Sequence, residues 1–309
     1  MNVIASSPEG LEKYLASEIF DLGGNNINTY KRSVVFECDY ATFYRVHFYS
    51  RIAFRFYREV ARFNCYDKQS LYDGIRNSFP WLEWLPFNKT FNVQVTGRNS
   101  ALSHSHFTAL EVKNSITDLQ KSVWNKRSNI SLDSPDLIIH LHLNNEQAIV
   151  SLQSTFESLH KRGYRPGIGN APLKENLAAG LLKMTGWNGT KPLIDIMCGS
   201  GTFLIEAVNQ LLKVPLKFPQ SYLFENWIDF HKDIFLDEKF KAKKRFIDYG
   251  KLSAIIGCEI NKNVFDQAKG NILLAGLEKY IHLQNNDFSN IQFQSKDGLI
   301  VCNPPYGKQ

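Results

Sequence analysis

The sequence predicts an α/β protein in which a parallel, doubly wound sheet fills the C-terminal half and smaller α+β regions precede it. Three observations favour this fold class. After residue 156, apolar segments of strand length alternate with helical patterns, as in sheets covered by helices on both faces. A glycine-rich turn follows the first of these strands and leads into a helix. Before residue 156, short strands and amphipathic helices follow one another without an internal repeat.

Length and composition indicate a soluble, cytoplasmic protein of two or three domains. The chain has 309 residues, of which 43% are hydrophobic and 21% are charged. Its apolar segments are too short to cross a membrane, and its N-terminus lacks the pattern of a secretory signal. The five cysteines are scattered without a CxxC pair, which is typical of reduced thiols in the cytoplasm.

The charge is compatible with a nucleic-acid partner but does not establish one. The formal net charge is +6, and basic residues cluster at 121–127, 161–165 and 239–245. Such clusters attract phosphates regardless of base sequence. They are equally typical of solvated helix faces, so charge alone leaves both interpretations open.

Residues 1–60 form the first predicted domain, a small α+β unit. We expect strands at 3–5, 34–36 and 54–56 and helices that end near Phe20 and begin at Tyr40. Gly23 and Gly24 are placed to end the first helix.

Residues 61–155 form the second predicted domain. Helices are expected at 71–79 and 107–124, a half-buried strand at 91–95, and a hairpin of strands 137–143 and 148–152. His140 and His142 share a strand face, as do His104 and His106 if that segment is extended. The sequence offers no further ligands nearby, so we expect an exposed strand face and no metal site.

Residues 156–309 form the third predicted domain, which follows a connector rich in glycine, proline and arginine at 161–167. A polar and aromatic insertion at 213–253 interrupts it, and a packed surface helix is favoured over RNA contact for its Trp227 and its basic 239–245 segment. The elements expected in this domain are helices at 173–184, 202–212 and 264–275 and strands at 192–196, 254–258, 281–284 and 298–302.

The first chemical motif is the strand that ends at Asp195 and the glycine turn after it. An acid at the strand end can hold the cationic amino group of a methionine moiety, and glycines let a ligand approach the backbone closely. A dinucleotide site is the competing interpretation, but its G-x-G-x-x-G pattern would need glycine where Leu204 stands. The candidate cofactor-binding residues of this motif are Asp195, Cys198, Gly199, Ser200, Gly201 and Thr202.

Two more acids follow the next strands. Glu259 ends the strand at 254–258 and is placed to accept hydrogen bonds from both hydroxyls of a ribose, although a surface glutamate would look the same. Asp287 could accept a hydrogen bond from an adenine amino group while Phe288 packs on the ring. By itself this third motif predicts only a turn. It supports a cofactor site because it follows the next predicted strand after the first two motifs.

The most specific motif is Asn303, Pro304, Pro305 and Tyr306 after the last predicted strand. These are the candidate catalytic residues, and Asn303 is also a candidate cofactor-binding residue. The exocyclic amine of a nucleobase is a poor nucleophile because its lone pair is delocalised into the ring. The side-chain oxygen of Asn303 and the carbonyl of Pro304 can each accept one of its N–H groups, which frees the lone pair for attack on a methyl group. Pro305 stiffens the turn, and Tyr306 can stack on the base. No general base is needed before transfer if the methyl donor is a sulfonium.

These motifs, in this order, resemble the class I methyltransferase fold, and the whole chain resembles the bacterial THUMP-domain RNA guanine-N2-methyltransferases of the large ribosomal subunit. Residues 158–165 are similar to a connector of that family, and 170–179 to the helix that opens its catalytic domain. The resemblance implies a ferredoxin-like domain at 1–60, an RNA-gripping THUMP domain at 61–155 and S-adenosylmethionine as the cofactor. It implies N2-methylation of a guanine in 23S rRNA. A tRNA guanine-N2-methyltransferase is a close neighbour.

The sequence departs from the family in two places. Ile196 stands where the family usually has proline, and only residues 307–309 follow the Asn-Pro-Pro-Tyr motif, so the methyltransferase domain is expected to be incomplete at its C-terminus. We expect weakened cofactor binding and little or no methyl transfer by such a chain, because the strand that carries Asn303 would be a sheet edge. The alternatives are an active enzyme completed by residues outside this sequence or by a partner chain, an inactive RNA-binding remnant, and a DNA amino-methyltransferase.

Overall fold

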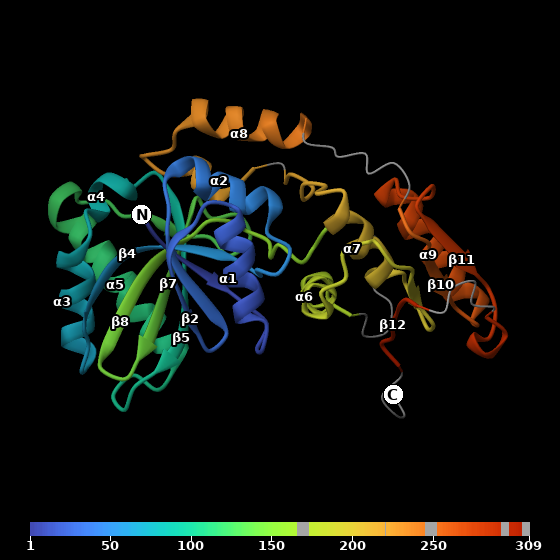
Figure 1. Cartoon of the computed structure of the whole chain (residues 1–309). Helices are drawn as coiled ribbons and strands as arrows, with labels where there is room; N and C mark the ends of the chain where they lie inside the picture. The colour runs from blue at the N-terminus through green and yellow to red at the C-terminus, as the bar shows by residue number, and fades with distance from the viewer. Residues whose placement is uncertain (166–172, 220, 245–251, 292–296, 305–309) are drawn as a thin grey trace.

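Two β-sheets organise the chain. The structure, a computed structural model, describes residues 1–165, 173–219, 221–244, 252–291 and 297–304. Figure 1 shows an N-terminal body around an eight-stranded sheet and a C-terminal body around a four-stranded sheet. No helix in these ranges combines the length and the hydropathy that crossing a membrane requires.

The eight-stranded sheet joins strands from both predicted N-terminal domains. Its order is β2-β3-β1-β4-β8-β7-β5-β6, and β4 pairs antiparallel with both β1 and β8. The predicted boundary between residues 60 and 61 falls inside β4, and the division into two domains stays a prediction. The strands are β1 (Asn2–Ser6), β2 (Asn25–Tyr30), β3 (Ser33–Glu37), β4 (Phe56–Asn64), β5 (Thr90–Arg98), β6 (Asn129–Ile130), β7 (Leu137–Asn144) and β8 (Gln147–Gln153).

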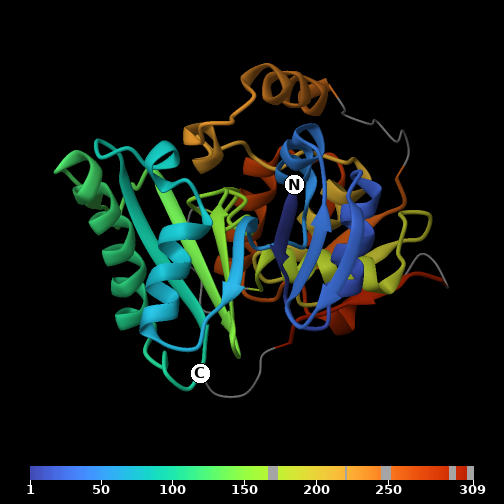
Figure 2. The same ribbon diagram turned by 90° about the vertical axis from the view of Figure 1, so that its left-hand side faces the viewer.

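The N-terminal helices begin at polar caps and pack through apolar residues. Asp39 accepts a hydrogen bond from the Thr42 N–H at 2.8 Å and so begins α2, and Asp67 and Ser70 form a capping box for α3. Helices α3 and α5 lie side by side and pack against strands of the sheet, as Figure 2 shows. The helices are α1 (Glu12–Asp21), α2 (Tyr40–Tyr49), α3 (Lys68–Ser78), α4 (Trp81–Trp84) and α5 (Ser105–Trp124).

Some expectations for this half were wrong. Strand β2 was not expected, and the strand placed at 54–56 begins at Phe56 and continues to Asn64. His106 lies in α5, so it cannot share a strand face with His104. His140 and His142 do share a face, but both are half-buried there and lie within 3.1 Å of Thr96 Oγ1. In the described ranges, no group of three or more His, Cys, Asp or Glu could hold a metal ion.

The four-stranded sheet is parallel throughout and has the order β11-β10-β9-β12. Its two inner strands, β10 and β9, are mostly apolar and buried, and Leu193 and Ile255 are fully buried. The elements are α6 (Glu175–Thr185), β9 (Leu193–Asp195), α7 (Thr202–Leu211), β10 (Ile255–Cys258), α9 (Lys262–Ala275), β11 (Ile281–Gln284), a 3₁₀ turn η2 (Phe288–Asn290) and β12 (Leu299–Val301).

The insertion reaches back from the C-terminal body and packs on the N-terminal one (Figure 1). It contains a 3₁₀ turn, η1 (Leu223–Asn226), and the helix α8 (Lys232–Lys244), which lies along α2. Trp227 is only 5% exposed and belongs to the N-terminal core, and Arg45 of α2 pairs with Glu238 of α8 at 2.9 Å. The expected packed surface helix is therefore confirmed for the described part of the insertion. Arg245 lies outside that part.

A buried ionic cluster joins the two bodies. Glu206 of α7 is fully buried and lies 3.2 Å from Arg51 and 3.6 Å from Arg162 of the connector. The hydroxyl of Tyr164 donates to the same carboxylate at 3.1 Å, and Arg162 also donates to the backbone carbonyl of Arg51 at 2.6 Å. The connector is thus held to both bodies by hydrogen-bonded charges rather than by apolar contact alone.

Candidate functional site

The carboxyl ends of the four parallel strands meet at one edge of the C-terminal sheet. Asp195 ends β9 and lies in register with Gly257 of β10 on one side and Val301 of β12 on the other. The chain moves outward from β9 through β10 to β11 and then returns to the other side of β9 with β12. Ligands of doubly wound sheets bind in the crevice at such a reversal of strand order.

The glycine turn after β9 has the backbone conformation that its sequence predicts. Gly199 and Gly201 have positive φ angles of 52° and 81°, which side chains other than glycine rarely adopt. The Cys198 N–H donates to the carbonyl of Cys258 at 2.8 Å, which ties the turn to β10. Apart from the two chain neighbours of Gly199, no described residue has a heavy atom within 4 Å of where its Cβ would be, so a ligand can approach this backbone.

Glu259 is brought directly to the glycine turn. Its carboxylate accepts hydrogen bonds from the Gly199 N–H at 3.1 Å and from the Asn261 N–H at 2.9 Å. Its own N–H donates to the carbonyl of Gln284, the last residue of β11. Motifs that are about 60 residues apart in the sequence therefore share one site, as parallel strands predict.

Asp195 is a buried carboxyl with little compensation from the protein. It is 2% exposed and accepts one hydrogen bond from the Met197 N–H at 3.3 Å. Burial raises the pKa of Asp195 to about 7, and the nearby charge of Glu259 acts in the same direction. A cationic group bound beside Asp195 would favour its ionised form.

The residues of the third motif lie at the same edge but outside the turn. Asp287 accepts hydrogen bonds from the N–H and the hydroxyl of Ser289 at 2.9 and 2.7 Å, and the backbone bond holds its pKa below the usual range. Phe288 is 47% exposed, so its ring face is available to a ligand.

The fourth motif follows β12. Asn303 is half-buried, two residues beyond Val301, the register partner of Asp195, and Pro304 is exposed. Pro305 and Tyr306 lie outside the described residues. The structure thus brings Asp195, the glycine turn, Glu259 and Asn303 to one edge of the sheet.

Arg165 and Glu175 also reach the glycine turn, and their contribution was not expected from sequence. Arg165 pairs with Glu175 at the start of α6 at 2.6 Å and lies 3.4 Å from the hydroxyl of Thr202. Thr202 Oγ1 in turn lies 3.2 Å from Ser200 Oγ. The second carboxylate oxygen of Glu175 is buried without a hydrogen-bond partner among the described residues. The only sequence signal for this pair was the resemblance of their segments to a connector and a helix.

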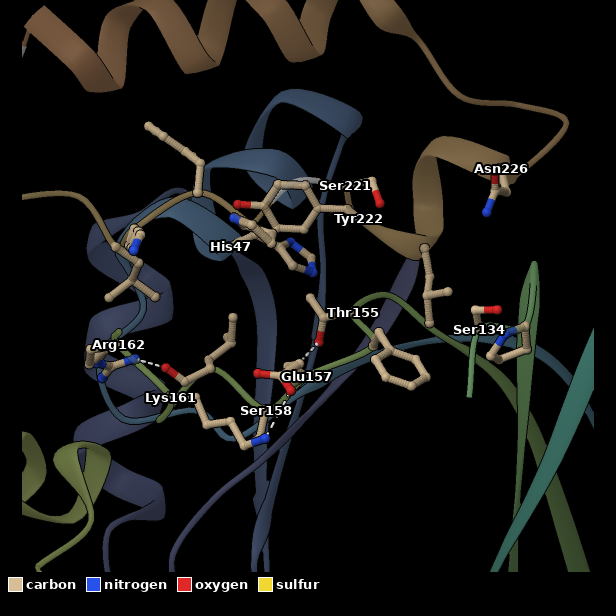
Figure 3. A pocket seen from close by; sticks show the side chains of 18 of the residues that line it. His47, Ser134, Thr155, Glu157, Ser158, Lys161, Arg162, Ser221, Tyr222 and Asn226 are labelled. Carbon is tan, nitrogen blue, oxygen red and sulfur yellow. Dashed lines mark hydrogen bonds and ion pairs between the residues drawn. The ribbon is translucent and has the colours of Figure 1, made fainter. Parts of the chain in front are cut away.

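A cavity of about 690 Å³ lies away from these residues, between the connector and the insertion (Figure 3). Its lining includes His47, Thr155, Arg162 and Tyr222 but none of the predicted site residues that the structure describes. Burial lowers the pKa of His47 to about 4, so its ring is neutral at pH 7 and hydrogen-bonds Ser154.

Comparisons with known proteins agree with this fold. Three family profiles match in succession: an RlmL ferredoxin-like domain at 2–57, a THUMP domain at 65–153 and an RMKL-like methyltransferase domain at 162–309. A putative RNA methyltransferase of Synechocystis is 40% identical over 309 residues, which cover 99% of this chain and 79% of that protein. The ribosomal RNA large subunit methyltransferase K/L of Vibrio parahaemolyticus is 34% identical over 313 residues.

The solved structures show the same arrangement. A putative methyltransferase, SMU.472, complexed with SAH, superimposes with a TM-score of 0.86 and 26% identity, and the match covers 100% of this chain and 81% of that one. The fold and the strand-end site therefore define a class I methyltransferase with ferredoxin-like and THUMP domains before it.

The chain belongs to the RlmL-like family of S-adenosylmethionine-dependent RNA methyltransferases. It spans 79% of the Synechocystis relative but 44% of the Vibrio K/L protein. The expectation of little or no transfer by this chain stays a prediction, and a transfer assay decides between it and the alternative of an active enzyme.

Proposed function

We propose that this chain transfers a methyl group from S-adenosylmethionine to the N2 amino group of a guanine in 23S rRNA. The observation that carries the proposal is the meeting of the buried Asp195, the glycine turn and Glu259 beside the strand that leads to Asn303. Asp195, the glycine turn and Glu259 suit the methyl donor, and the segment after β12 suits an amine acceptor.

The residues fit the cofactor in charge and shape. Asp195, which is buried and accepts one hydrogen bond from the described residues, suits the ammonium group of the methionine moiety. Gly199 and Gly201 line the carboxylate and ribose side of the site, where Cys198, Ser200 and Thr202 complete the turn. The Glu259 carboxylate is placed for the ribose hydroxyls, and Asp287 and Phe288 for the adenine.

The acceptor is positioned by the segment after β12. The bound cofactor supplies a methyl group that its sulfonium already activates. The Asn303 side-chain oxygen and the Pro304 carbonyl accept the two N–H groups of the target amine, which orients its lone pair. Pro305 stiffens this segment and Tyr306 stacks on the target base in the proposal.

The nature of the substrate rests on the N-terminal body. A THUMP domain matches there, and curated relatives are named as methyltransferases of large-subunit ribosomal RNA. The choice of guanine N2 comes from the resemblance of the whole chain to that family.

Product analysis tests the proposal. The purified chain is incubated with isotope-labelled S-adenosylmethionine and, in separate reactions, with unmodified 23S rRNA or unmodified tRNA. The digested nucleosides are separated by mass spectrometry. We expect the label in N2-methylguanosine. Label in N6-methyladenosine would contradict the guanine assignment. Label in tRNA but not in rRNA would show that tRNA is the substrate. Binding of S-adenosylhomocysteine without any transfer would contradict the catalytic claim.

A further inference from the structure

A second cavity, of about 420 Å³, lies where the N-terminal sheet meets the connector. Its lining comes from the segment before β4, from β5 and β7, from the connector, and from Lys174 just before α6. Four residues line both this cavity and the larger one in Figure 3: Lys161 of the connector, and Phe156, Glu157 and Ser158 just before it. None of the described residues proposed for cofactor or amine lines it, so it is separate from the part of the methyl-transfer site that the structure describes.

The lining of this cavity is rich in cations. Arg55, Lys161 and Lys174 contribute to it, and its acid, Glu157, is paired with Lys161 at 2.8 Å. His160 also lines the cavity. Burial, and then the charges of Lys174 and other neighbouring cations, lower the pKa of His160 to about 4. The Nε of Arg55 is buried and has no hydrogen-bond partner among the described residues. An anion in the cavity would therefore meet a positive field and an unsatisfied donor.

The cavity also presents amides that can read a base. Asn92 and Gln94 are two residues apart on β5, so their side chains lie on one face of the strand. No hydrogen bond to either side-chain amide is found among the residues that the structure describes. Gln153 is 1% exposed, and its Oε1 also lacks a partner there. Strands β7 and β8 are antiparallel, and Leu152 lies opposite Ile139. Gln153 is therefore on the same face of the sheet as Ile138, which lines the cavity.

An exposed aromatic ring lies at the edge of the cavity. Phe156 is 43% exposed although it borders both cavities, and Leu132 beside it is 70% exposed. Phe54 is covered by the Lys174 ammonium at 5.4 Å from its ring centre. Bases that have been splayed out of a stack bind to aromatic faces and cationic groups of this kind.

We propose that this cavity binds one unpaired nucleotide of the RNA substrate. Arg55 and Lys174 take its phosphate, Asn92 and Gln94 hydrogen-bond the edge of its base, and Phe156 stacks on the base. A base in a duplex could not enter, because its hydrogen-bonding edge is already paired. The inference rests on the proposed function, since the ligand is part of the same RNA substrate.

Binding of two RNA hairpins to the full chain tests this inference. The hairpins share one stem, and only one carries a short single-stranded 3′ extension. Affinity is measured by fluorescence anisotropy for the wild type, for the double variant N92V/Q94V and for Phe156→Ala. Gln147→Val, on the exposed end of β8 outside the cavity, is the matched control. Valine favours strands, so the double variant should keep its fold, which thermal unfolding checks.

We expect the wild type to prefer the extended hairpin and each cavity variant to bind that hairpin about tenfold more weakly. Binding of the blunt hairpin and of S-adenosylhomocysteine should stay unchanged. Cavity variants that keep the wild-type preference would overturn the inference and leave the proposed function standing. A wild type that binds neither hairpin would contradict both. A single-stranded DNA extension that binds as well as RNA would overturn the assignment to RNA.

Discussion

At the scale of residues, the buried carboxyl of Asp195 makes stability and cofactor binding depend on pH. Its ordinary pKa of 3.8 is raised to about 7, so between these values the folded chain binds more protons than the unfolded chain. The free energy of unfolding contributed by this group therefore falls as pH rises through that window. We expect Asp195→Asn to be more stable than the wild type at pH 8 and to lose this advantage near pH 4, as measured by denaturant unfolding at both values.

The same carboxyl should set the pH dependence of cofactor binding. The ammonium group of S-adenosylhomocysteine needs the ionised form of Asp195, so wild-type affinity should rise as pH passes through about 7. In Asp195→Asn the affinity should be roughly 10- to 100-fold lower and independent of this titration. Isothermal titration calorimetry across pH measures both effects. If the affinity of Asp195→Asn depended on pH as that of the wild type does, Asp195 would not be part of the cofactor site.

Glu259 is predicted to act through two ribose hydroxyls. Glu259→Gln keeps the shape of the side chain but loses its charge, so S-adenosylhomocysteine should bind at least about tenfold more weakly. Glu278→Gln, on the loop after α9, is the control and should bind as the wild type does. Equal affinities for the two variants would argue that Glu259 only closes the glycine turn.

At the scale of elements, the sequence predicts apolar strands better than polar ones. The strand expected at 254–258 is observed as β10, because a buried parallel strand needs a continuous apolar segment, and Ile255 to Cys258 provide one. Strand β2 has the sequence NNINTY, and it exists through backbone pairing with β3 rather than through burial of its side chains. No apolar pattern could have indicated it.

The strand-end acids could be predicted for a related reason. Parallel strands end at a common edge, so one polar residue after each apolar segment is enough to assemble a site. Arg165 could not be predicted in this way, because it reaches Thr202 from a connector 37 residues earlier. Its place depends on how the connector packs, and no local pattern records that.

The buried cluster around Glu206 tests how firmly the elements are joined. In Glu206→Gln the guanidinium groups of Arg51 and Arg162 would remain buried without a countercharge. We expect the free energy of unfolding to fall by about 3–5 kcal/mol. Lys262→Gln, which breaks an exposed pair with Asp266, should change it by about 0.5 kcal/mol or less. Chemical denaturation compares the two variants. Similarly small effects would mean that water reaches Arg51 and Arg162 in the Glu206→Gln variant and solvates their charges.

At the scale of the whole molecule, the insertion ties the catalytic body to the N-terminal one. The ring of Trp227 is buried against Phe43, and the Arg58 guanidinium lies 5.7 Å from its centre. Trp227→Ala should lower the free energy of unfolding by about 3–5 kcal/mol, although the residue lies in an insertion. Ile228→Ala, at an exposed position of the insertion, is the control. If Trp227→Ala lost no more stability than Ile228→Ala, the insertion would not stabilise the N-terminal body.

The central claim is that one edge of the C-terminal sheet binds the methyl donor and positions an amine. Methyl transfer to 23S rRNA by the wild type and by Asn303→Ala, with binding of S-adenosylhomocysteine measured in parallel, tests it most directly. We expect the variant to bind S-adenosylhomocysteine with nearly wild-type affinity and to lose at least about a hundredfold in transfer. Transfer by Asn303→Ala at the wild-type rate, or loss of binding equal to the loss of transfer, would contradict it.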